Sequence, residues 1–162
     1  MREDGVAMRL ELTRRADYAV RAVLELAAQD ERLSVPELAV RQSIPVRFLP
    51  QVMQALVGAG LVVAQMGRRG GYLLARDPAS ITLLEVIEAV EGDARRKTCV
   101  LRGVPCGADG QCAVHPVFAA AQEKLLEALD AATLASIVAA DRPGIAPDGT
   151  GHSAHHTGRA TP

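Results

Sequence analysis

The feature that most constrains the fold is a pair of short apolar segments joined by a glycine-rich turn. The segments are residues 61–64 and 72–75, and the turn at 67–71 reads Gly-Arg-Arg-Gly-Gly. Apolar runs separated by such a turn are typical of a β-hairpin. Amphipathic helical patterns precede this hairpin, so we predict a mainly α-helical fold that carries one small β-hairpin.

Three helices are predicted ahead of the hairpin. The first begins near Thr13, where apolar residues recur at the spacing of one helix face. These residues are Ala16, Ala19, Val20, Val23, Leu24 and Ala27. The second begins at Ser34, whose hydroxyl is expected to form a capping box with Glu37, and it ends at the turn 42–45.

The third helix is predicted to begin near Pro45 and to end at Gly58 and Gly60. Pro50 conflicts with this start, because a proline inside a helix removes a hydrogen bond and crowds the preceding turn. The helix must therefore begin later than Pro45 or kink at the proline. Its inner face is predicted to hold Phe48, Leu49, Val52, Met53, Leu56 and Val57.

The order of three helices followed by a hairpin is that of a winged helix-turn-helix. Beyond the hairpin, Thr82 and Glu85 predict a second capping box, which opens a helix that ends at Gly92. A long helix is then predicted from His115 to Ala140. Aromatic residues make up 2% of the chain and Trp is absent, so the core must consist of Ala, Leu and Val.

Composition and charge divide the chain into segments. Residues 8–79 carry 10 Lys and Arg against 7 Asp and Glu, whereas residues 80–141 carry 5 against 9. The front half is therefore the part suited to a polyanion. We expect an extension at 1–7, a winged helix-turn-helix DNA-binding domain at 8–80, a cysteine loop with dimerisation helices at 81–140, and a disordered tail at 141–162.

Five polar residues are candidates for contact with DNA. In a helix-turn-helix the second helix enters the major groove, with its N-terminal residues facing the base edges. Arg can read guanine and Gln can read adenine, while Ser can hold a phosphate. Two arginines between glycines at a wing tip suit a minor groove or its phosphates. The candidates are Ser43, Arg47 and Gln51 in the helix-turn-helix and Arg68 and Arg69 in the wing.

All three cysteines of the chain lie in one short stretch. Six residues separate Cys99 from Cys106, five separate Cys106 from Cys112, and His115 follows. Glycines and a proline among them indicate a loop, which can point three sulfurs at one centre. Thiolates select zinc, copper(I) or iron–sulfur clusters. The alternative is a disulfide with one spare thiol, although nothing indicates export and disulfides are rare in the cytosol.

Several segments, in the same order, resemble one family of bacterial regulators. They are residues 13–21 (TRRADYAVR), 44–62 (IPVRFLPQVMQALVGAGLV), 67–75 (GRRGGYLLA), 80–92 (SITLLEVIEAVEG) and 133–138 (TLASIV). On these segments, which span roughly residues 8–140, the chain resembles the winged helix-turn-helix transcription regulators that include the iron–sulfur regulator IscR and the nitric-oxide sensor NsrR.

The resemblance implies a homodimer with crossed C-terminal helices and one iron–sulfur cluster per subunit. Each cluster would be held by Cys99, Cys106 and Cys112, near the first helix of the partner. His115 resembles the histidine that completes a 2Fe-2S site in IscR. Asp17 resembles the acid of NsrR that reaches a 4Fe-4S cluster across the dimer. His115 and Asp17 are therefore alternative candidates for the fourth ligand, and His115 with a 2Fe-2S cluster is preferred.

The residues and the resemblance together predict a DNA-binding repressor whose operator affinity is controlled by the cluster. Nitric oxide, redox stress and the supply of iron or clusters all stay open as stimuli. The alternative is the same dimer with a zinc or thiol–disulfide switch. No paired carboxylates, phosphate loop or Rossmann fingerprint points to an enzyme or a small-molecule substrate. No signal peptide or membrane-length apolar run is visible, so we expect a cytoplasmic protein without a membrane partner.

Overall fold

The computed structural model describes residues 11–29, 31–67, 70–94 and 113–140. The predicted extension at 1–7, the two wing arginines, the three cysteines and the predicted tail at 141–162 lie outside these ranges. In the described ranges, no helix is both long enough and apolar enough to cross a lipid bilayer.

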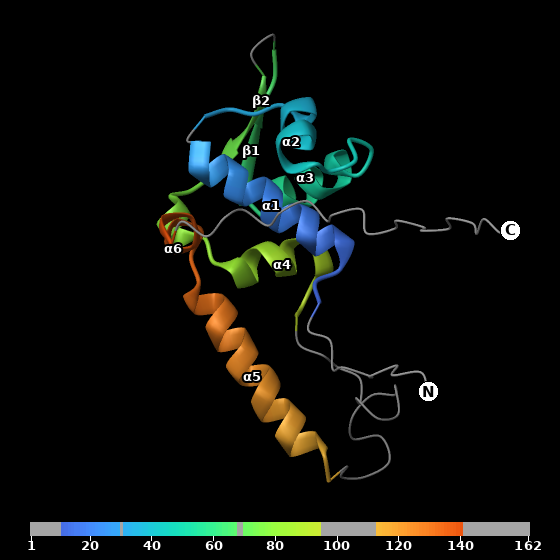
Figure 1. The fold of residues 1–162 in the computed structure, drawn as a ribbon, viewed down its shortest axis with the longest axis vertical. Helices are drawn as coiled ribbons and strands as arrows, with labels where there is room; N and C mark the ends of the chain where they lie inside the picture. The colour runs from blue at the N-terminus through green and yellow to red at the C-terminus, as the bar shows by residue number, and fades with distance from the viewer. Residues whose placement is uncertain (1–10, 30, 68–69, 95–112, 141–162) are drawn as a thin grey trace, which may run out of the picture.

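The elements follow the predicted order, with helices ahead of a hairpin and further helices after it (Figure 1). They are α1 (Arg14–Gln29), α2 (Val35–Gln42), α3 (Leu49–Gly58), β1 (Val62–Gln65), β2 (Gly71–Leu74), the 3₁₀ turn η1 (Pro78–Ser80), α4 (Leu83–Glu91), α5 (His115–Ala131) and α6 (Leu134–Ala139). Helices α2 and α3 with the hairpin form the winged helix-turn-helix that the sequence predicts.

Both predicted capping boxes are present. The Ser34 side chain accepts a hydrogen bond from the Glu37 backbone N–H, and the Glu37 carboxylate in turn accepts from the Ser34 backbone. Thr82 and Glu85 make the same reciprocal pair at the start of α4. Hydrogen bonds from the side chain and backbone of Ser34 hold the pKa of Glu37 below its usual value of 4.5. The first turns of α2 and α4 are therefore fixed by residues close in sequence.

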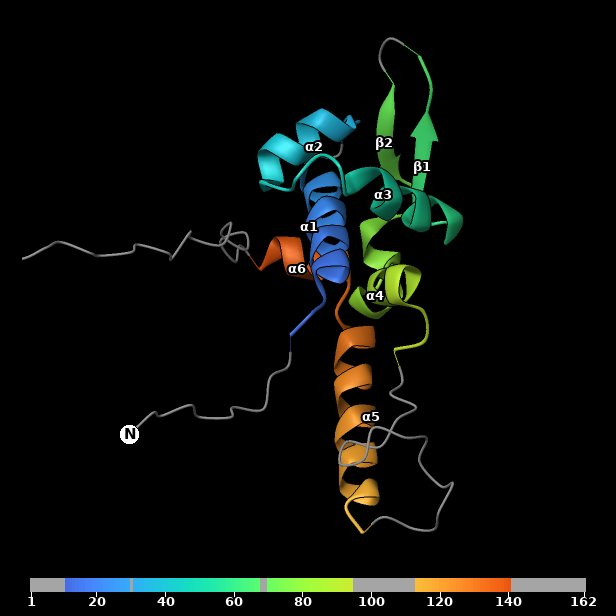
Figure 2. The same cartoon turned by 90° about the vertical axis from the view of Figure 1, so that its right-hand side faces the viewer.

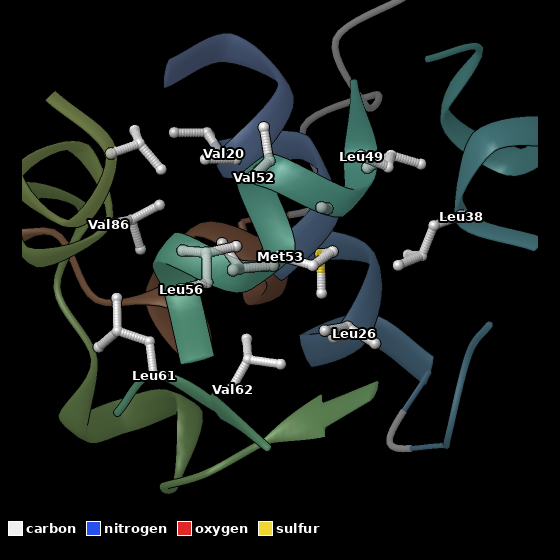
Figure 3. Close-up of a cluster of buried hydrophobic side chains, with 14 of the residues drawn as sticks. Val20, Leu26, Leu38, Leu49, Val52, Met53, Leu56, Leu61, Val62 and Val86 are labelled. Carbon is white, nitrogen blue, oxygen red and sulfur yellow. The ribbon is translucent and has the colours of Figure 1, made fainter. Parts of the chain in front are cut away.

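The core lies where α1, α3 and α4 meet, with α2 and α6 closing its sides. Figure 3 shows side chains converging from these helices, among them Leu26 of α1, Met53 and Leu56 of α3 and Val86 of α4. Each of these four side chains is fully or almost fully buried. The prediction that the core consists of Ala, Leu and Val was incomplete, because Met53 and isoleucines such as Ile81 are buried with them. Among the described residues, Tyr18 and Tyr72 pack against this aliphatic core and are only partly buried. Small and branched aliphatic side chains let the three helices pack closely.

Helix α3 begins later than Pro45, and this settles the conflict over Pro50. The helix starts at Leu49, so Pro50 lies in its first turn, where a proline removes no intrahelical hydrogen bond. The start predicted near Pro45 was therefore wrong. Leu49, Val52, Met53 and Leu56 are buried as predicted, but Phe48 and Val57 are each 38% exposed. Phe48 precedes the helix and Val57 lies toward the edge of its packed face.

The predicted helix from 115 to 140 is interrupted. At the break, the Leu83 N–H donates to the Ala132 carbonyl (2.8 Å), and the Leu134 N–H donates to the Ile81 carbonyl (3.0 Å). Leu134 is fully buried, and the Thr133 side chain caps α6. These bonds to the segment before α4 stop α5, so the prediction of one uninterrupted helix was wrong.

Two glycines position the wing against the rest of the domain. Strands β1 and β2 pair in antiparallel register, with Val62 opposite Leu74. Gly71 has φ +153°, and a Cβ on it would lie 2.8 Å from the Leu33 carbonyl oxygen. A Cβ on Gly70 would lie 2.6 Å from the Gln65 carbonyl oxygen. Both positions therefore require glycine, because the wing backbone comes too close to its neighbours for a side chain.

Candidate nucleic-acid interface and cluster-binding segment

The turn between α2 and α3 sets the direction of the recognition helix. Ser43 follows α2 in the left-handed conformation (φ 51°), the only described non-glycine residue with positive φ. The Ile44 N–H then donates to the Ala39 carbonyl (3.0 Å), which satisfies the end of α2. Ile44 itself is buried. Ser43, a predicted phosphate contact, is exposed at this turn.

Three polar side chains mark the outward side of α3 and the turn before it. Arg47 lies in that turn, Gln51 lies in the first part of the helix, and both are exposed. Gln54 is also exposed, one turn after Gln51. Gln54 was not among the predicted contact residues, although its spacing of three from Gln51 places it on the same helix face. Arg47, Gln51 and Gln54 therefore form a polar strip at the surface expected to face DNA.

An aromatic pair joins the first helix to the start of the recognition helix. The rings of Tyr18 in α1 and Phe48 lie with their centroids 5.8 Å apart and their planes tilted by 33°. The Arg47 guanidinium lies 4.8 Å from the centre of the Phe48 ring, a cation–π contact. The partial exposure of Phe48 thus reflects its position between α1 and Arg47 rather than a place in the core.

A buried arginine ties the first helix to the end of α2. Arg21 is 7% exposed. Its Nη1 donates to the Gln42 carbonyl (2.9 Å) and its Nη2 pairs with Asp17 Oδ2 (3.0 Å). Its guanidinium carbon lies 5.4 Å from the centre of the Tyr18 ring. Arg21 therefore holds together the candidate ligand Asp17 and the turn that leads into α3.

The described residues that precede the cysteine segment are anchored to α1, α4 and α5. On the leading side, the Ala94 N–H donates to Glu88 of α4 (3.2 Å), and Gln122 of α5 donates to the Ala94 carbonyl (3.4 Å). Glu91, the last residue of α4, accepts a hydrogen bond from the Thr13 hydroxyl just before α1 (2.7 Å). Ala94, the last described residue before the cysteines, is thus bonded to α4 and α5, and the end of α4 is bonded to the residue before α1.

The two candidate fourth ligands occupy different places. His115 is exposed in the first turn of α5, directly after the cysteine segment. The Asp17 side chain is 30% exposed and engaged with Arg21. In the residues that the structure describes, no three or more His, Cys, Asp or Glu side chains are grouped to hold a metal ion. The cysteines lie outside those residues, so the predicted ligand set stays a prediction.

Helix α5 projects from the domain on the side opposite the wing (Figures 1 and 2). Leu126 is its only buried residue. Three large apolar side chains of α5 face solvent: Val117 is 68% exposed, and Phe118 and Leu125 are each 39% exposed. Such an exposed apolar surface on a helix is typical of an interaction site.

The chain is similar in sequence and in structure to known transcriptional regulators. The family model Rrf2, described as an iron-dependent transcriptional regulator, matches residues 12–140. The HTH-type transcriptional regulator IscR of Klebsiella pneumoniae is 35% identical over 131 residues, which is 80% of each protein. An rrf2-like HTH-type regulator of Rhodobacter capsulatus is 31% identical over 142 residues, which is 82% of this chain and 95% of that protein. The solved structure of T. potens IscR has a TM-score of 0.68 at 26% identity and covers 86% of this chain and 94% of that one.

Proposed function

Because the chain belongs to the Rrf2 family of iron-dependent transcriptional regulators, we propose that it is a homodimeric repressor whose operator affinity is controlled by an iron–sulfur cluster. Its function is transcriptional regulation rather than catalysis. The observation that carries the DNA-binding part is the exposed polar strip Arg47, Gln51 and Gln54, which follows directly on the α2–α3 turn. The cluster part is carried by the three cysteines between α4 and α5.

In the proposed complex, α3 enters the major groove and the wing reaches the flanking backbone. Gln51 would read a base edge, Ser43 and Arg47 would contact phosphate or base, and Arg68 and Arg69 would extend the wing contact. The buried residues of α3 and the hydrogen bond from Arg21 to the end of α2 support this role, because they hold the recognition helix at a fixed angle.

We expect Gln51→Ala to relax specificity at one base pair of each half-site. A well-placed glutamine contact discriminates against the wrong base by about 1–3 kcal/mol. The operator is first obtained by selection of the wild-type protein on random duplex DNA. Binding of both proteins is then measured on that operator and on its single-base variants. The variant should lose the preference at one symmetric position and keep it elsewhere; an unchanged preference at every position would remove Gln51 from the interface.

The proposed dimer uses α5. Its uncovered apolar side chains, Val117, Phe118 and Leu125, supply the surface that a second copy would cover. Two copies related by a two-fold axis would present two α3 helices to two half-sites. The distance between these helices must match the half-site spacing, so any change in the arrangement of α5 alters the affinity for the operator.

The donor set fits an iron–sulfur cluster. Three thiols within one short segment, with a histidine or carboxylate as a weaker fourth ligand, are the residue types that such clusters accept. Cys99, Cys106 and Cys112 would hold it, completed by His115 or by Asp17 of the partner subunit. The group would supply a centre that oxidants, nitric oxide or loss of iron can alter.

The chain's own contacts provide a route from this segment to the recognition helix. The start of the cysteine segment is bonded to α4 and α5 through Ala94. The end of α4 is bonded to Thr13 at the start of α1. One turn further along α1, Asp17 and Arg21 connect to the end of α2. A change in the cluster bound by the cysteine segment would therefore move α1 relative to the α2–α3 turn. Such a movement would favour one of two arrangements of the dimer.

A further inference from the structure

A concave pocket of about 180 Å³ lies between the first turns of α1 and the start of α3. Aromatic and aliphatic side chains form its apolar part, and arginines from α1 stand beside them. Its lining residues are Arg14, Arg15, Tyr18, Phe48, Gln51 and Val52. The pocket therefore adjoins the proposed DNA-reading surface through a residue that they share, Gln51.

The arginines around this pocket are not neutralised by acids. Most other basic side chains of the described part form ion pairs, as Arg21 does with Asp17 and Lys124 does with Glu127. In the same part of the chain, Arg14, Arg15 and Arg47 form none, and all three are exposed. The nearby acid, Asp17, is itself occupied by Arg21 (3.0 Å). The pocket is thus an apolar hollow with uncompensated positive charge.

We propose that this pocket receives the sugar-phosphate backbone of the operator, so that α1 contributes a second contact to DNA beside the recognition helix. A backbone phosphate would lie between the guanidinium groups of Arg14 and Arg15, and the deoxyribose would pack against Tyr18 and Phe48. The proposal rests on the proposed docking of α3 in the major groove, because that docking brings a phosphate strand to the rim of the pocket.

The charge and the shape of the pocket both favour this occupant. Arginine presents a planar set of N–H donors that matches phosphate oxygens. An apolar floor beside it accommodates the carbon face of a sugar without stranding a polar group. Phosphate contacts carry no sequence information but fix the position of a protein on the duplex. The role assigned to Arg14 and Arg15 is therefore to position α3, while Gln51 reads sequence.

The test compares the salt dependence of DNA binding for the wild type and for Arg14→Gln/Arg15→Gln. Each phosphate contact contributes about 0.9 to the slope of log affinity against log salt. Because Arg14 and Arg15 share one phosphate, the double variant should lose about 0.9 from the magnitude of that slope per bound subunit, on the selected operator and on an unrelated duplex alike. The doubly conservative variant Arg14→Lys/Arg15→Lys should recover most of the lost slope.

Lys124→Gln is the matched control. It removes one positive charge from α5, on a side chain that is 79% exposed and part of a different element. Its slope should equal that of the wild type. A double variant whose slope equals that of Lys124→Gln would overturn the α1 contact. A wild type that selects no duplex at all would instead contradict the proposed function itself.

Neutral methylphosphonate linkages, placed one at a time along the operator, give a second readout. One linkage per half-site should weaken the wild type and leave the double variant unaffected, since the variant no longer uses that phosphate. If no linkage distinguishes the two proteins, and the double variant instead dissociates more readily into monomers, the pocket is occupied by the partner subunit and the DNA contact is excluded.

Discussion

Replacement of Cys106 by alanine is expected to give a folded protein that holds no cluster and binds its operator with one fixed affinity. Cys106 is the middle of three thiols, and its loss leaves two thiolates for a group that needs more. A stimulus can change operator affinity only through the difference between two states of the dimer. Without the cluster that difference is absent, so nitric oxide, oxidant or iron depletion should leave operator binding unchanged.

The measurement combines visible absorption, iron content and operator titration before and after the stimulus. Val104→Ala is the matched control, because it truncates a side chain in the same segment and keeps all three cysteines. This control should retain colour, iron and response. A Cys106→Ala protein with the spectrum, iron content and response of the wild type would contradict the proposed ligand role.

Replacement of Leu56 by alanine is expected to cause a large loss of stability. Leu56 is 0% exposed and lies in α3 at the centre of the core shared with α1 and α4 (Figure 3). Truncating a buried leucine removes favourable apolar burial and leaves a cavity, which together cost about 2–5 kcal/mol. That is a large part of the roughly 5–15 kcal/mol by which a typical domain is stable. The recognition helix should loosen as well, so operator affinity should fall.

Val57→Ala is the matched control for this experiment. Val57 is the next residue of the same helix, but its side chain is 38% exposed. Its truncation should cost no more than about 0.5 kcal/mol, in the range of ordinary surface substitutions. Urea unfolding at one fixed protein concentration compares the two variants. If both variants lost the same stability, Leu56 and Val57 would have to be equally buried, which would contradict their exposures of 0% and 38%.

The same two residues show how far sequence reasoning reached. Periodicity located the body of α3 and four of its buried side chains, Leu49, Val52, Met53 and Leu56, but it placed the start of the helix too early. It could not separate Val57 from Leu56, since both are apolar and adjacent, and only the position of α1 and α4 decides which is covered. The capping boxes at Ser34 and Thr82 were predictable because every group involved lies within four residues.

Long-range contacts account for what the sequence did not predict. The break between α5 and α6 is fixed by backbone bonds to residues 81–83. Its one local signal is Thr133, a residue type favoured at a helix N-cap. The hydrogen bond from Arg21 to Gln42 was equally hidden, because Gln42 belongs to a different helix, whereas the ion pair with Asp17 is a local contact one turn away in α1. The pocket at Arg14 and Arg15 exists only because α1 packs beside the start of α3. The cysteine ligands were inferred from residue type and spacing and stay a prediction.

The most direct test of the cluster is the visible absorption spectrum of the protein purified without oxygen, together with its iron and acid-labile sulfide content. The account predicts a brown protein that contains both elements, with the iron count per subunit separating a two-iron from a four-iron cluster. A colourless protein that contains zinc, or that has no metal, would contradict cluster control. The winged helix-turn-helix and its DNA-binding role would then stand with a zinc or thiol–disulfide switch in place of the cluster.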